Sequence, residues 1–222
     1  MSSGPDIPEL TPVFPLKAVL FPRAEMPLHI FEPRYRAMTA DAMAGERFIA
    51  IALLRPGYDN LYHTLHAPIH PTIGVGRITM CNQLSDGRYA LVLRGVARAM
   101  IIEELPGRPY RFARVEAVGD RANTSESTLR RLRIELRDAV TSAMQEPRRV
   151  EQLRRLCDGE LPLAALTDCI ASRMPFAPPV AQVLLEEGEV AARARRLIDH
   201  LKTLAAVVRN RRRQWAGQMS SN

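Results

Sequence analysis

The sequence predicts an α+β protein in which a small β-barrel or folded sheet is followed by a helical half. Two observations carry this prediction. Up to Val118 the apolar segments are short and separated by turn residues, whereas after it the apolar residues recur at steps of three and four. Side chains repeat every two residues in a strand and every 3.6 in a helix, so the change of period indicates a change of element type. We expect domains at residues 1–119 and 120–216, followed by a polar tail at 217–222.

Four prolines divide the first apolar run, residues 13–38, into short pieces. Proline has no N–H for a strand ladder and biases the preceding residue toward extended backbone. Each piece therefore predicts a short extended segment that ends at a bend. At Pro33 the effect reverses, because proline is favoured at the first position of a helix. Tyr35, Met38 and Ala42 then follow at helical spacing, which predicts a helix over 34–45 with Gly45 as its C-cap.

The middle of the chain predicts six or seven short strands in total. Residues 48–54 form a continuous apolar run, as expected of a strand buried on both faces. Residues 73–80 and 89–94 flank Ser85-Asp-Gly-Arg88, and Asp-Gly is a strong hairpin signal. Gly95 is interpreted as a break before a further strand at 97–104, and another follows at 110–118. Gly74 and Gly76 indicate sharp bends or a close approach of another backbone.

The helical half predicts five helices. The first spans 129–144 and is terminated by Pro147, and two shorter ones follow at 150–157 and 163–174. Pro178-Pro179 is interpreted as the opening of a further helix at 180–187. The last helix carries one heptad seam, formed by Val190, Ala194, Leu197, Leu201, Leu204 and Val208. We interpret this seam as intramolecular packing against the preceding helices. The alternative is a homodimer through Val190, Leu197, Leu201 and Leu204.

Composition and charge argue against several classes of protein. The formal net charge is +7, but residues 1–120 hold 13 basic against 12 acidic side chains, and aromatic residues make up only 5% of the chain. Nucleic-acid binding is therefore not favoured, because such modules concentrate basic charge and interleave aromatic residues. No run of 18 apolar residues and no secretory signal occurs, so we expect no membrane span. Three cysteines without a CxxC pair predict a reduced, cytoplasmic protein.

The N-terminal motifs resemble the Lon-protease amino-terminal, or LON substrate-binding, family. The residues that carry the resemblance are Phe14-Pro-Leu16, Val19-Leu-Phe-Pro22, Pro27-Leu-His-Ile-Phe-Glu32 and Pro33-Arg-Tyr-Arg36, in a strand, a second strand and a helix start. Weaker similarity continues to about residue 205. The resemblance implies a PUA-like pseudo-β-barrel followed by a C-terminal helical bundle that ends in a long helix. The segment 58–71 departs from the family pattern.

No catalytic constellation emerges from the sequence. His63, His66 and His70 have helical spacing, but Pro68 and Pro71 forbid a regular helix, so we expect an exposed loop and no metal. Cys81, Cys157 and Cys169 have no context that would activate a thiol nucleophile. Neither GxxxxGK[ST] nor GxSxG occurs. We expect a stand-alone, non-catalytic protein without the ATPase and protease modules of Lon and without a cofactor.

The resemblance implies a binding module for exposed apolar segments of unfolded or partly folded polypeptides, with a protease or chaperone as a further partner. The residues proposed for polypeptide binding are Phe21, Met26, Leu28, Phe31 and Tyr35; the alternative is that they fill the barrel core. A second hypothesis is a PUA-like RNA-binding protein that uses the basic helical half. A small-ligand pocket in the barrel ranks last.

Overall fold

The structure is a computed structural model that describes residues 6–144 and 146–219, with side chains up to Asn210. It confirms the α+β fold. The chain forms two compact units: the first contains the residues up to Gly119 together with 171–188, and the second contains 120–170 and the residues from Glu189 onward. The domain boundaries predicted from the sequence stay a prediction, although one unit boundary coincides with residue 119. No helix among the described residues is long and apolar enough to cross a membrane.

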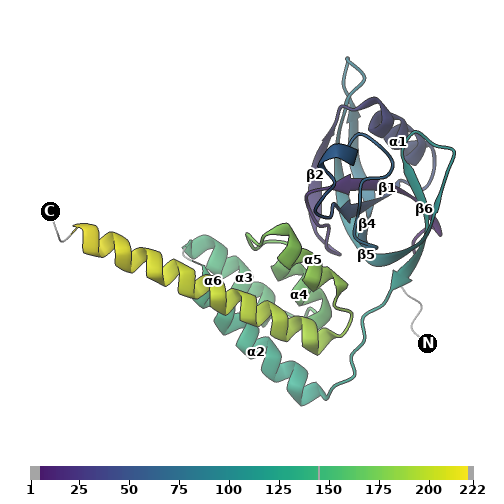
Figure 1. The fold of residues 1–222 in the computed structure, drawn as a ribbon. Helices are drawn as coiled ribbons and strands as arrows, with labels where there is room; N and C mark the ends of the chain where they lie inside the picture. The colour runs from purple at the N-terminus through teal and green to yellow at the C-terminus, as the bar shows by residue number, and fades with distance from the viewer. Residues whose placement is uncertain (1–5, 145, 220–222) are drawn as a thin grey trace. The chain divides into compact units, whose positions relative to one another are not determined.

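The first unit is a sheet that closes on itself (Figure 1). Its described strands are β1 (Leu10–Leu16), β2 (Glu25–Ile30), β3 (Phe48–Leu53), β4 (Thr72–Gln83), β5 (Tyr89–Leu105) and β6 (Arg111–Val118). Their order is β2-β5-β4-β3-β1-β6, and a second pairing between β5 and β6 closes the barrel. Among these six strands, the β1–β3 pair is parallel and the other pairs are antiparallel. As predicted, β3 is almost entirely buried.

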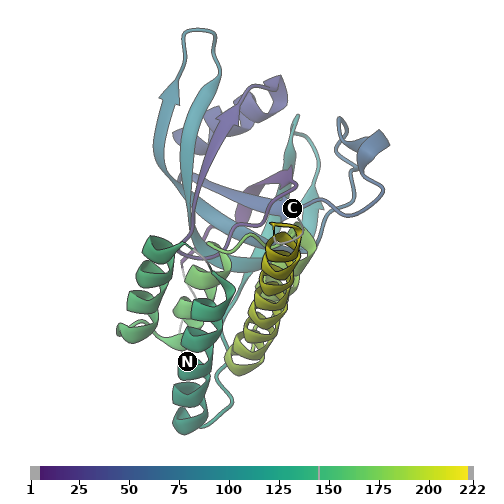
Figure 2. The same ribbon diagram turned by 90° about the vertical axis from the view of Figure 1, so that its left-hand side faces the viewer.

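β5 is one long strand, so the break predicted at Gly95 is wrong. Its first part pairs with β2 and β4, and its last part pairs with β6. The ladder shifts register between Val75 and Gly76 but continues through Gly95. The hairpin that joins β4 to β5 extends beyond the other strands (Figure 2). We call the three-stranded sheet of β2, the first part of β5 and the last part of β4 the arm.

The segment between β1 and β2 is not a strand, whereas the family resemblance implies one strand that includes residues 14–16 and 19–22. Residues 17–24 instead pass directly over two glycines of the sheet. A Cβ atom at Gly74 would lie 1.9 Å from the carbonyl oxygen of Leu20, and one at Gly95 would lie 2.0 Å from that of Phe21. Gly95 also exchanges hydrogen bonds with the segment, because its N–H donates to Ala24 and its carbonyl accepts from Arg23, both at 2.8 Å.

One helix covers one end of the core of the first unit. Helix α1 (Pro33–Ala44) begins at proline and is followed by Gly45, as predicted. Its inner face contributes Tyr35, Met38 and Ala42 to a cluster with side chains of β1, β2, β3, β4 and β5. The rings of Tyr35 and Phe14 lie 4.3 Å apart. A single 3₁₀ turn, η1 (Asp59–Leu61), interrupts the loop between β3 and β4.

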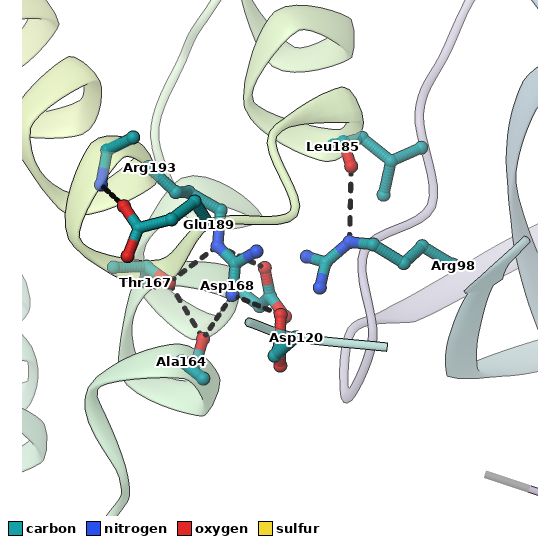
Figure 3. A network of polar contacts seen from close by, with 9 residues as sticks. Arg98, Asp120, Ala164, Thr167, Asp168, Leu185, Glu189 and Arg193 are labelled. Atoms are coloured by element: carbon teal, nitrogen blue, oxygen red, sulfur yellow. Dashed lines mark hydrogen bonds and ion pairs between the residues drawn. The ribbon is translucent and has the colours of Figure 1, made fainter. Parts of the chain in front are cut away.

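A second helix belongs to the first unit although it lies far along the chain. Helix α5 (Pro178–Glu186) begins at a proline pair, as predicted. Its buried Gln182 donates to the carbonyl of Thr72 at the start of β4, at 2.8 Å. The guanidinium of buried Arg98 on β5 donates to the carbonyl of Leu185 at 3.1 Å (Figure 3). The same chain segment therefore completes the hydrogen bonding of two strands.

The second unit contains α2 (Glu126–Ala143), α3 (Pro147–Asp158), α4 (Leu163–Ala171) and α6 (Val190–Met219). Ser125 caps α2, because its side chain accepts from the N–H of Thr128. Pro147 begins α3 rather than ending α2, which already stops at Ala143. The reason is the same as for Pro33: proline is tolerated in the first turn of a helix, because the backbone N–H groups there have no hydrogen-bond partner within the helix.

A buried arginine connects the helices of the second unit. Arg193 on α6 is fully buried, and its guanidinium contacts Asp120, Thr167 and Asp168 (Figure 3). The distances are 2.7 Å to Asp120, 3.0 Å to the hydroxyl of Thr167 and 3.6 Å to Asp168. A buried guanidinium is tolerated only with such partners, because desolvation of an unpaired charge is costly.

The heptad seam of α6 faces the interior of the second unit. Val190, Leu197 and Leu201 are buried within the chain, and Leu204 is half-buried. The helix packs against α2. This burial supports intramolecular packing, and a homodimer through these four residues stays untested. The predicted polar tail at 217–222 lies in part outside the described residues, which end at 219.

Candidate functional site

The outer face of the arm carries an apolar row across three strands. Pro27 on β2 pairs with Val92 on β5, and Val92 pairs with Met80 on β4. Residues directly opposite one another in a sheet share a face, so these three side chains lie side by side. Met80 is 60% exposed, Pro27 is exposed and Val92 is half-buried. The row is therefore an apolar strip on the surface of the first unit.

A second exposed apolar side chain, that of Phe31, follows the last residue of β2. It is 60% exposed, and its ring lies 6.4 Å from the ring of His29, which is exposed on β2. Within the described residues β2 pairs with β5 alone, so its other edge carries no neighbouring strand. An edge strand can accept a further extended chain through its free N–H and C=O groups. We call Pro27, Phe31, Met80 and Val92 the arm patch.

The structure divides the five residues that the sequence suggested for polypeptide binding. Phe31 is exposed, whereas Met26 and Leu28 are half-buried on the inner face of β2 and pack against the core. Phe21 and Tyr35 are buried, at 2% and 4% exposure. Only Phe31 of the five presents most of its side chain to solvent, and the other four have the environment expected of core residues.

Sequence reasoning missed Met80 and Val92. Both lie in segments interpreted only as strands, and nothing in the alternation of their neighbours distinguishes them from inward-facing residues. The irregular register of β4 explains this, because the ladder shifts between Ile78 and Met80. Such a shift changes which side chains point outward. The exposure of Met80 therefore follows from the register of β4 with β5 and not from the sequence of β4 alone.

The start of α1 is fixed to the loop that precedes β4. The guanidinium of Arg34 donates to Glu32 at 3.0 Å, to the carbonyl of Tyr62 at 2.9 Å and to that of Thr64 at 3.2 Å. It also lies 4.4 Å from the ring centre of Tyr35. Burial raises the pKa of the Tyr35 phenol to about 12, so this group is neutral at physiological pH. Arg34 therefore connects the first turn of α1 to the carbonyls of the loop that precedes β4.

The residues considered for metal binding and thiol chemistry are not assembled into a site. Among the residues that the structure describes, no three His, Cys, Asp or Glu side chains are placed to hold a metal ion. His70 instead pairs with Glu186 of α5 at 3.0 Å. Burial raises the pKa of Cys81, and it raises that of Cys157 to about 11, which is the opposite of nucleophile activation.

The fold matches solved amino-terminal domains of Lon proteases. The N-terminal domain of the Mycobacterium avium complex Lon protease superposes with a TM-score of 0.67 at 21% identity, covering 86% of this chain and 97% of that one. A Lon N-terminal domain protein from Xanthomonas campestris gives a TM-score of 0.60 at 22% identity, with the same coverage. The architecture is thus that of a Lon N-terminal domain.

The sequence assigns the family. The family described as "ATP-dependent protease La (LON) substrate-binding domain" matches residues 11–203, and the chain belongs to it. Similar full-length relatives are Lon protease of Anaeromyxobacter dehalogenans, 28% identical over 88% of this chain, and Lon protease 2 of Myxococcus xanthus, 27% identical over 88%. The chain spans about a quarter of the length of these relatives, namely 23% and 24%.

Proposed function

We propose that this protein is a non-catalytic recognition module that binds exposed apolar segments of unfolded or partly folded polypeptides. The observation that supports the proposal most directly is the arm patch: Met80 and Phe31 are each 60% exposed, and Pro27 of the patch lies on β2, the edge strand of the arm. Flexible methionine side chains suit surfaces that accept many sequences. Membership of a substrate-binding family agrees with this use.

Phe31 is the proposed direct contact among the five residues suggested by the sequence. Met26 and Leu28 lie on the inner face of β2. They fix the position of this strand because they pack against the core. Phe21 and Tyr35 support this region from within the core. The backbone at the edge of β2, apart from Pro27, which has no N–H to donate, would bind the polypeptide backbone, and the patch would bind its apolar side chains.

The test is the affinity for a permanently unfolded, fluorescently labelled polypeptide. The variants Phe31→Ser and Met80→Ser should each weaken binding by about threefold to tenfold, because each removes an exposed apolar contact of the kind that carries binding energy. Ile102→Ser is the matched control: Ile102 is 54% exposed on β5 but lies outside the arm. Equal losses in all three variants, or none in the first two, would contradict the assignment.

A single-stranded RNA oligonucleotide measured in parallel over a salt series tests the alternative function. Phosphate contacts lose affinity steeply with salt because counterions are released, whereas apolar contacts do not. We expect salt-tolerant binding of the polypeptide. Salt-sensitive binding of RNA alone would favour an RNA-binding protein and overturn the first proposal.

We further propose that the module delivers its polypeptides to a protease or chaperone, in line with the Lon proteases among its relatives. The cytoplasm is the proposed compartment, and it agrees with the finding that Cys81, Cys157 and Cys169 form no disulfide among the described residues. Co-purification of an ATP-dependent protease with the wild-type protein, but not with a denatured control, would support delivery.

A further inference from the structure

Two cavities lie at the start of β6, and Tyr110 and Phe112 line both of them. The smaller, of about 230 Å³, includes Asp41, which accepts hydrogen bonds from the Tyr110 hydroxyl at 2.5 Å and from Arg108 at 2.8 Å. The polar groups of Asp41, Arg108 and Tyr110 thus satisfy one another. The larger cavity, of about 440 Å³, is lined by Leu65, His66, Glu104, Leu105, Pro106, Tyr110, Arg111 and Phe112. It shares no residue with the arm patch.

The walls of the larger cavity pass from an exposed rim to a buried floor. His66, Glu104 and Pro106 are exposed, Leu65, Leu105 and Phe112 are half-buried, and Tyr110 and Arg111 are buried. The Phe112 ring is held in place from the other cavity, where the Arg108 guanidinium lies 4.3 Å from its centre. The volume and the mostly apolar lining with few polar groups match those of small-ligand sites.

A neutralised ion pair defines the polar end of this cavity. Arg111 donates to both oxygens of Glu104, at 2.8 Å from Nε and 2.5 Å from Nη2. Its Nη1 donates to the carbonyl of Ala67. The guanidinium charge is thereby balanced, and the half-exposed carboxylate keeps lone pairs that can accept further hydrogen bonds. Apart from the exposed His66 at the rim, the lining holds no basic side chain other than Arg111, which is already paired, so an acidic ligand would meet the carboxylate without a strong cation to offset it.

We propose that this cavity binds a neutral aromatic group that carries an N–H or O–H donor, of which indole is the simplest example. The ring would lie between Leu65, Pro106 and Phe112, and the donor would reach the Glu104 carboxylate. Burial between apolar side chains favours a flat aromatic ring. The carboxylate of Glu104 favours a ligand with an N–H or O–H donor over a ligand with a negative charge. The same chemistry occurs in a free small molecule and in a tryptophan side chain of a bound polypeptide. The inference does not depend on the arm patch.

Fluorine NMR of 5-fluoroindole with the purified full chain tests this assignment. We expect saturable binding of 5-fluoroindole and at least about tenfold weaker binding of 4-fluorobenzoate. Backbone amide signals of Leu65, Leu105 and Phe112 should shift on addition of 5-fluoroindole to the wild-type protein. Absence of saturable binding, equal binding of the acid, or shifts confined to other residues would overturn the proposal.

A pair of variants provides the matched control. Leu65→Trp fills the cavity from its rim and should weaken 5-fluoroindole binding by at least about tenfold. Leu61→Trp makes the same change on the same loop, at a residue that is 39% exposed and outside the lining, and should leave binding unchanged. Equal effects of the two would refute the site. The amide shifts of the wild-type protein keep the test valid if Leu65→Trp fails to fold.

A capped Ala-Ala-Trp-Ala-Ala peptide distinguishes the two sources of the ligand. Displacement of 5-fluoroindole by the peptide from the wild-type protein and from Leu61→Trp would support the cavity as a site for a polypeptide side chain. Binding of 5-fluoroindole without displacement by the peptide would support a site for a free aromatic molecule.

Discussion

At two positions of the sheet, Gly74 and Gly95, the segment that crosses over the sheet leaves no room for a side chain. The backbone of residues 20–22 lies so close to Gly74 and Gly95 that a Cβ atom at either position would come within 2.0 Å of a carbonyl oxygen. Neither carbonyl belongs to a flexible side-chain end, so the crossing segment itself would have to move. The glycines are therefore required for the close approach and not for a turn.

Gly95→Ala should lower the free energy of unfolding by at least about 2 kcal/mol, because the methyl group cannot be accommodated without moving residues 21–22. Gly119→Ala is the control, since nothing lies within 4 Å of its Cβ position, and it should change stability by less than about 0.5 kcal/mol. Urea unfolding followed by circular dichroism measures both. A tolerated Gly95→Ala would show that the crossing segment is adaptable.

The buried phenol of Tyr35 makes stability depend on pH in the alkaline range. Its pKa is raised from 10.0 to about 12 in the folded protein, so the unfolded chain loses this proton first. The resulting stabilisation is complete below pH 10 and is lost as pH rises through about 12. Urea unfolding between pH 8 and pH 11.5 should show this decline. Tyr35→Phe should show a shallower decline, and an unchanged slope would assign the effect to other groups.

At the scale of the element, prolines were the most instructive signal in the sequence. Pro33 and Pro178 begin α1 and α5 as predicted, because a first-turn proline gives up no hydrogen bond. Pro147 was assigned to the end of α2 and instead begins α3. The sequence alone does not decide between the two roles, since a proline can either end the helix before it or begin the helix after it.

Helix α6 is attached to its unit by one buried side chain in addition to its apolar seam. Arg193 contacts Asp168, which is 2% exposed, and Asp120. Arg193→Met should lower the free energy of unfolding by about 3–5 kcal/mol, because it removes the cation that faces a buried carboxylate. Arg195→Met, an exposed neighbour on the same helix, should have little effect. Comparable stability of the two variants would show that the network is dispensable.

The strands and helices were largely predictable, whereas the candidate sites were not. Period, glycine and proline signals located β2, β3, β4 and β6 at nearly their observed positions. Gly95 misled because its role depends on a segment about 70 residues away in sequence, around Phe21 and Ala24. Met80 and Arg111 acquire their surroundings only through the sheet register. Long-range pairing of this kind leaves no trace in local periodicity.

On the scale of the whole molecule, the first unit is not continuous in sequence. Helix α5 supplies hydrogen-bond partners to Thr72 and Arg98, and Glu186 pairs with His70. A fragment of residues 1–119 should therefore unfold at lower urea concentration than the full chain. Addition of a synthetic peptide of residues 171–188 should raise its midpoint. A fragment as stable as the full chain, with no response to the peptide, would show that α5 is accessory.

The return of the chain to its first unit has a consequence during synthesis. Residues 120–188 must be translated before α5 can dock, and at about 5–20 residues per second this takes about 3–14 s. During that interval the strands are already complete while Gln182 has yet to be made. A nascent chain in this state exposes surfaces that the finished protein covers, so it is a natural client for the chaperones that meet chains at the ribosome.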